Sequence, residues 1–175
     1  MSGSDRTPVG RTLREGVLLG TLGYVTVAVF YAAFDFLAAR GTLYTVDLLG
    51  KAFFRGLRDP AVLQLPATPD LTALFLYNLL HLALSLAIGL IVAWLLARAE
   101  RGPRHALTSL GVMVVGFVVT VLAAGLLTEP IRPLLPWWSI VWANAAAVLV
   151  AGTAVVWRRP GVLRTLFGGS GPPPA

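Results

Sequence analysis

One histidine, inside a long apolar run, is the residue of this sequence that is best suited to carry out chemistry. His81 lies within the run 71–97, and Tyr77 and Asn78 precede it by four and three residues. Residues at these two spacings share one face of a helix. An imidazole on such a face can relay a proton, bind a polar ligand or donate a hydrogen bond to a quinone carbonyl. Because a titratable group is costly to keep inside a membrane helix, His81 is the first candidate for a functional residue.

Other polar side chains fall at a similar depth along their own apolar runs. Asp35, Thr120 and Asn144 each lie in the half of a run that we expect to face outward, on the orientation derived from charge below. Asp35 could accept a hydrogen bond from His81 or reach to Arg40 at the interface, and the sequence leaves both open. The simplest alternative is a purely structural role between helices, worth about 0.6–2 kcal/mol for each group. The predicted polar cluster consists of Asp35, Tyr77, Asn78, His81, Thr120 and Asn144.

Several kinds of chemistry are missing from the sequence. It contains no cysteine, which removes disulfides, thiolate metal sites and thiol nucleophiles. Haem held by two imidazoles needs a second histidine inside the membrane, and the other histidine, His105, lies at a loop. Neither paired carboxylates nor a glycine-rich phosphate loop is present. We therefore expect no metal ion, no cofactor and no catalytic residue.

The composition is that of an integral membrane protein. Of the 175 residues, 57% are hydrophobic and 13% are charged, against roughly 25% charged residues in an average soluble domain. The mean hydropathy is +0.78. Four apolar runs, at 17–39, 71–97, 106–127 and 137–157, are each long enough to cross a hydrocarbon layer about 30 Å thick as a helix. They lack the alternation of a barrel strand.

These runs predict an all-α fold, a polytopic bundle of four transmembrane helices. We expect a single membrane domain over residues 13–167. The flanking segments 1–12 and 168–175 are polar or rich in proline and glycine, so we expect them to be flexible. The second and third loops are short, and consecutive helices should therefore be antiparallel neighbours.

The distribution of Lys and Arg predicts the orientation of the bundle. Nine of them lie before the first run, between the second and third runs and after the fourth, whereas five lie in the other two loops. Loops rich in Lys and Arg stay in the cytoplasm. We therefore expect both ends of the chain to be cytoplasmic. This bias also explains the net charge of +6, so we expect the lipid bilayer as a partner and no nucleic acid.

A short helix is expected in the first loop, which spans residues 40–70. Thr45 can cap this helix, and Lys51 follows Asp47 at the spacing of a helical ion pair. The segment 45–58 is largely apolar and too short to cross a membrane, so we expect it to lie flat in the outer interface. It is either a lid over the outer mouth of the bundle or a passive connector, and the connector is the simpler interpretation.

Small side chains at every fourth position predict where helices approach closely. We expect the second apolar run to pack against the fourth, and the first run carries a further small pair, Gly16 and Gly20. The same side chains could instead pack two copies of the chain together, or reflect the abundance of alanine and glycine in membrane helices. The stripes comprise Ser85, Gly89, Ala93 and Ala97 on the second run and Ala143, Ala147 and Ala151 on the fourth.

The first loop and the second run also resemble a known group of proteins. Tyr44-Thr45, Leu49-Gly50 and Phe53-Phe54 lead into a helix that carries His81 and, eight residues later, Gly89. This pattern, over residues 40–92, is similar to that of an uncharacterised group of small four-helix bacterial membrane proteins. The resemblance implies the four-span fold and a bacterial cytoplasmic membrane. It implies no activity, cofactor or site residue.

Three functions are compatible with the sequence. The first is a non-catalytic accessory, assembly or modulatory component that works with other membrane subunits or with a second copy of itself. The second is a small transporter or proton-coupled carrier that uses the predicted polar cluster. The third is a quinone-binding protein, which the histidine alone suggests. The small size and the lack of reactive side chains favour the first.

Overall fold

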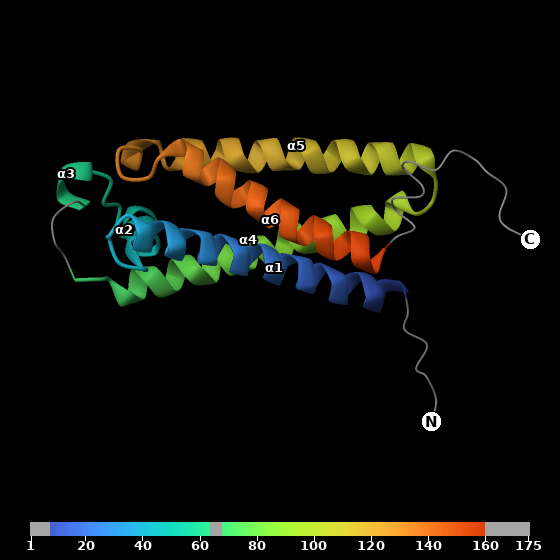
Figure 1. Ribbon diagram of the computed structural model, residues 1–175, viewed down its shortest axis with the longest axis horizontal. Coiled ribbons are helices and arrows are strands. Elements are labelled where there is room, and N and C mark those ends of the chain that lie inside the picture. The colour runs from blue at the N-terminus through green and yellow to red at the C-terminus, as the bar shows by residue number, and fades with distance from the viewer. Residues whose placement is uncertain (1–7, 64–67, 160–175) are drawn as a thin grey trace, which may run out of the picture.

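Four long helices run side by side along the long axis of the molecule (Figure 1). The computed structural model describes residues 8–63 and 68–159. Within these ranges all regular structure is helical, and four helices are long and apolar enough to cross a membrane. The predicted all-α, multi-pass membrane bundle is confirmed. The spanning helices are α1 (Pro8–Leu37), α4 (Leu71–Ala99), α5 (Pro103–Leu127) and α6 (Trp137–Arg158).

The helices match the predicted runs well, except at the beginning of the first. α1 begins at Pro8, so residues 8–12, which we expected to be flexible, are helical. Proline is favoured in a first turn because the N–H that it lacks would have no partner there. Arg11 stabilises the turn that follows, since its Nε lies 3.0 Å from Oε1 of Glu15 one turn further along. The predicted C-terminal tail, 168–175, lies outside the described residues.

The spanning helices form a ring in which each packs against two others. α4 lies between α1 and α5, and α6 closes the ring between α5 and α1. α4 and α6 therefore face each other diagonally and barely touch in the described part of the chain. Our expectation that the second and fourth spanning helices form the close pair is wrong. The closest pair is α1 with α4.

Glycine explains why α4 packs on α1. A Cβ atom added to Gly20 would lie 2.6 Å from the carbonyl oxygen of Ser85 and 2.7 Å from Cα of Leu86. A Cβ added to Gly89 would run into the backbone of Gly16 and Gly20. The two backbones touch directly, and the alanines of α6 do not permit so close an approach.

The alanines of the predicted stripes fill space between side chains instead. Ala93 is fully buried in a cluster with Leu19 and Leu96. Ala143 is fully buried in a second cluster toward the other end of the bundle. These positions are ordinary core packing. The half-buried members of the stripes are Ser85, Ala97, Ala147 and Ala151.

The helix predicted in the first loop is α2 (Tyr44–Phe54), and it lies across one end of the bundle, where Figure 1 shows it nearly end-on. We call this end of the bundle the α2 end. The helix is shorter than the expected segment 45–58. It ends where Gly56 takes a φ of 66° and the Leu57 N–H turns back to the Lys51 carbonyl at 3.3 Å. A further short helix, α3 (Pro60–Leu63), follows.

α2 is packed into the bundle rather than resting loosely on it. Leu48 is buried in one cluster with Ile131, which belongs to η1 (Glu129–Ile131), a short 3₁₀ helix after α5. At Gly50 the backbone of α2 meets the first turn of α4, where an added Cβ would lie 2.7 Å from the Ala73 carbonyl oxygen. This end of the bundle is therefore closed by apolar contacts from α2 and η1.

Candidate functional site

Asp35 is completely buried, and its carboxylate binds neither of its two expected partners, His81 and Arg40. Both carboxylate oxygens bind Thr45 in α2: Oδ2 accepts from the backbone N–H at 2.7 Å, and Oδ1 accepts from the hydroxyl at 2.7 Å. The first N–H groups of a helix have no partner within that helix, and a carboxylate from α1 satisfies one of them. We had expected Thr45 to cap α2, and this expectation is wrong, because α2 has no side-chain cap. Asp35 joins α1 to α2 instead of pairing with His81.

The Arg40 side chain also binds groups other than the Asp35 carboxylate. Its Nη1 donates to the Leu134 carbonyl oxygen at 3.1 Å. Its guanidinium lies 5.2 Å from the ring centroid of Phe34 and 5.0 Å from that of Tyr44. These contacts link the turn after α1 to the segment between η1 and α6. The alternative in which Asp35 reaches to Arg40 through its side chain is therefore wrong too.

His81 lies between two tyrosine rings. Its ring centroid is 5.2 Å from that of Tyr24 on α1 and 6.1 Å from that of Tyr77, one turn earlier on α4. The residue is half-buried, and its imidazole makes no hydrogen bond or ion pair with any described residue. The imidazole nitrogens, like the Tyr77 hydroxyl, therefore have no hydrogen-bond partner in the described part of the chain.

Asn78 connects the two helices beside His81. The Tyr24 hydroxyl donates to Asn78 Oδ1 at 3.0 Å, and Asn78 Nδ2 donates to the Leu74 carbonyl oxygen at 2.9 Å. Sequence reasoning missed Tyr24. A comparison of how far each tyrosine and each amide side chain lies along its apolar run would have indicated it. We call the group formed by Tyr24, Tyr77, Asn78 and His81 the His81 cluster.

Thr120 and Asn144 do not belong to this cluster. Thr120 Oγ1 donates to the Gly116 carbonyl oxygen at 2.8 Å, and Asn144 Nδ2 donates to that of Ile140 at 2.8 Å. Each acceptor lies one turn back on the same helix, so these bonds satisfy the side chain without joining two helices. The predicted six-residue cluster thus reduces to three of its members.

A polar network ties α2 to the beginning of α4. Sequence reasoning predicted its pair of Asp47 with Lys51, which is confirmed, and missed the rest. Asp70 caps α4 by accepting from the Ala73 N–H at 3.0 Å, and Arg55 binds the same carboxylate through Nε at 2.7 Å and Nη2 at 3.2 Å. Asp47 accepts from the Asp70 N–H at 2.8 Å and from Lys51 Nζ at 2.5 Å. An aspartate directly before an apolar helix is an N-cap pattern, and this was the available signal.

The network stabilises the ionised form of Asp70. Hydrogen bonds from Arg55, and then from the Ala73 N–H, lower the pKa of Asp70 from its ordinary 3.8 to about 2. The same ion pair raises the pKa of Arg55. α2 and α4 are therefore joined by full opposite charges at neutral pH.

The opposite end of the bundle has an ion-pair network of its own. Arg159, directly after α6, is buried and donates to Glu15 Oε2 of α1 through Nη2 and through Nε, the latter at 2.6 Å. Its Nη1 lies 3.1 Å from Oε1 of Glu100, which follows α4. One arginine thus ties three helices together. A buried cation needs such partners, because removal of one leaves its charge uncompensated.

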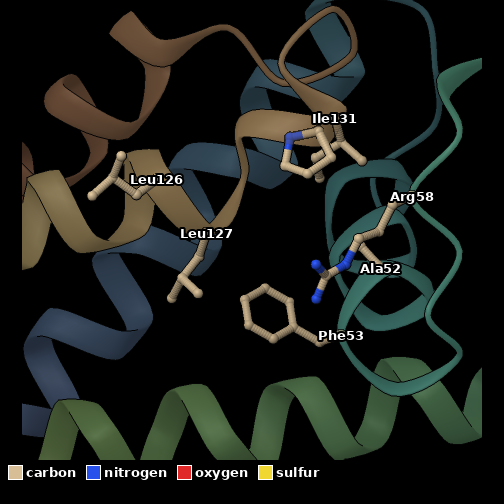
Figure 2. A pocket seen from close by; sticks show the side chains of 7 residues that line it. Ala52, Phe53, Arg58, Leu126, Leu127 and Ile131 are labelled. Carbon is tan, nitrogen blue, oxygen red and sulfur yellow. The ribbon is translucent and has the colours of Figure 1, made fainter.

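A pocket of about 110 Å³ lies at the α2 end, between α2 and the end of α5 (Figure 2). Phe53 of its wall also contacts Tyr77, with 6.1 Å between the ring centroids, so this wall adjoins the His81 cluster. Across the described ranges, no group of three His, Asp or Glu side chains is placed to hold a metal ion. The pocket is lined by Ala52, Phe53, Arg58, Leu126, Leu127, Pro130 and Ile131.

No family model, curated protein or solved structure matches this chain. The resemblance of residues 40–92 to small four-helix bacterial membrane proteins therefore stays a prediction. The His81 cluster offers one imidazole, two phenol hydroxyls and one amide, which together can bind hydrogen-bonding groups.

Proposed function

We propose that this protein is a non-catalytic membrane component that acts through the packing of its helices, as an accessory, assembly or modulatory subunit. The observation that supports this most is the engagement of both Asp35 oxygens by Thr45. Asn78 is likewise engaged by Tyr24. Two of the polar side chains that a carrier would use, Asp35 and Asn78, are thus occupied in contacts that hold the bundle together.

The two ends of the bundle support the same proposal. A carrier needs helices that rearrange around a site, whereas polar contacts here fix the helices at both ends. Asp35 and Asp70 fasten α2 to α1 and α4, and Arg159 fastens α6 to α1. A bundle held in one arrangement suits a protein that presents a constant surface to a partner.

We further infer that the protein lies in the cytoplasmic membrane of a bacterium, with the beginning of α1 and the end of α6 on the cytoplasmic side. The bias of nine to five in Lys and Arg supports this orientation. In Figure 1 the beginning of α1 and the end of α6 lie at the same end of the bundle, as this orientation requires.

Purification from the native membrane in a mild detergent tests the proposed function. A packing role predicts a complex of fixed stoichiometry, with another membrane protein or with a second copy of the chain. His81→Phe is a matched variant, because it keeps an aromatic ring between Tyr24 and Tyr77 and removes the imidazole nitrogens; it should leave the complex intact. A chain that is monomeric and without partners would count against the proposal.

A small proton-coupled carrier is the second candidate, and one observation favours it. The imidazole of His81 lacks a hydrogen bond within the described structure, so a proton or a polar ligand could bind to it. Reconstituted vesicles containing a pH-sensitive dye test this candidate. A carrier predicts a proton flux that is lost in His81→Ala and His81→Phe. Equal flux in the variants and the original protein would exclude His81 as the coupling residue.

A further inference from the structure

The pocket at the α2 end combines apolar walls with one cation. Leu127 and Ile131 approach it from α5 and η1, and Phe53 and Arg58 approach from α2 and the segment after it (Figure 2). In Figure 2 the guanidinium of Arg58 points into the space between these walls. No acidic side chain is among the lining residues. The pocket is therefore suited to a ligand that is partly anionic and partly apolar.

Arg58 has no carboxylate partner in the described structure, unlike the basic residues beside it. Lys51 and Arg55 each form an ion pair with an aspartate. Asp59, the neighbour of Arg58 in sequence, accepts from the backbone at the beginning of α3 instead. The fold thus neutralises two of the three cations that α2 and its following segment supply, and leaves free the one that points into the pocket.

The pocket lies where a spanning helix ends. Leu126 and Leu127 are the last two residues of α5, and they are 72% and 59% exposed. Apolar side chains exposed at this position face the lipid, so the pocket opens where the hydrocarbon layer meets the headgroups. An arginine at this level is surrounded by phosphate groups, which a planar guanidinium can bind through two parallel hydrogen bonds.

We propose that this pocket binds one anionic phospholipid, with the headgroup phosphate on Arg58 and the first part of an acyl chain against Phe53 and Leu127. Its volume of about 110 Å³ is below the roughly 300–1,000 Å³ of a site that encloses an organic ligand. The remainder of the lipid would extend along the exposed apolar side of α5. A single bundle carries the whole site, so the proposal does not depend on the proposed function.

Native mass spectrometry of the purified protein in detergent tests the proposal, with lipids added in known amounts. The probes are phosphatidylglycerol, whose phosphate carries an uncompensated charge, and phosphatidylcholine, whose choline compensates it. We expect the protein to retain one phosphatidylglycerol more tightly than phosphatidylcholine. Arg58→Gln should weaken retention of phosphatidylglycerol by about tenfold or more, because a charge-assisted hydrogen-bonded pair is lost. Leu127→Ser should also weaken it, through the acyl chain.

Arg132→Gln is the matched control. It removes one positive charge at the same end of the bundle from an exposed residue that does not line the pocket, and it should leave retention unchanged. Equal retention by Arg58→Gln and the original protein would overturn the proposal. So would an equal loss in Arg132→Gln, which would indicate general charge attraction. Displacement of the lipid by an equal concentration of inorganic phosphate would mean a site for a free anion and would also overturn it.

Discussion

Asp35 illustrates how a carboxylate inside a membrane bundle can serve the fold alone. Its position near the end of an apolar run marks it as an unusual charge, and this much could be predicted from the sequence. Its partner could not be predicted. Thr45 comes close to Asp35 only because Ala39 and Gly41 take positive φ angles in the turn between α1 and α2. Pairing across such a turn depends on backbone geometry that residue spacing does not reveal.

Removing the Asp35 carboxylate should destabilise the bundle. Asp35→Ala leaves the Thr45 N–H and hydroxyl buried without an acceptor, which costs roughly 1–3 kcal/mol per unsatisfied group. Thermal unfolding in detergent, followed by tryptophan fluorescence, measures the change. Thr120→Val is the control, because the Thr120 hydroxyl binds only its own helix. In a double-mutant cycle with Thr45→Val, the two effects should not add. Additive effects would contradict the contact.

The ion pair of Asp70 with Arg55 should make stability fall in acid. The folded pKa of about 2 lies below the ordinary 3.8, so the pair contributes stability above about pH 4 and loses it as the pH falls toward 2. NMR titration of the Asp70 carboxyl carbon measures the pKa directly. Arg55→Gln should raise it toward 3.8 without reaching that value, since the Ala73 N–H remains. Arg58→Gln should leave it unchanged. An Asp70 pKa near 3.8 in the original protein would refute the pair.

At the scale of elements, the helices were predictable and their pairing was not. Length and hydropathy determine that a run spans a membrane, and the four runs became α1, α4, α5 and α6 nearly as expected. Small-residue stripes occur on three of these helices, so spacing alone could not choose between partners. Glycine decides, because among the described stripe residues Gly16, Gly20 and Gly89 are the ones that let the backbones of two spanning helices meet. Alanine at the same spacing keeps the helices apart by one methyl group.

A single added methyl group should destabilise the contact of α1 with α4. In Gly20→Ala the new Cβ collides with backbone atoms of α4, and overpacking of this kind costs roughly 1–3 kcal/mol. Gly23→Ala is the matched control on the same helix, because nothing lies within 4 Å of its added Cβ. That variant should be neutral or slightly more stable, since alanine favours helix. Equal stability of the two variants, measured by thermal unfolding, would argue against the close crossing.

At the scale of the whole molecule, the charged loops predict the orientation in the membrane. The chain has no cysteine, so single-cysteine variants are free of background labelling. His105→Cys lies near the turn between α4 and α5, and Pro133→Cys lies between η1 and α6; both positions are exposed. Neither change alters the count of Lys and Arg. In intact bacterial cells a membrane-impermeant thiol reagent should label Pro133→Cys and spare His105→Cys. The reverse pattern would invert the orientation.

At the same scale, we propose that the protein acts by packing against other membrane helices. The mass of the assembly released directly from native membrane vesicles into a mass spectrometer tests this claim most closely. We predict a mass that corresponds to a fixed number of chains, or to this chain with a second membrane protein, and the same stoichiometry for His81→Phe. A mass equal to one chain with only lipid attached would contradict the claim.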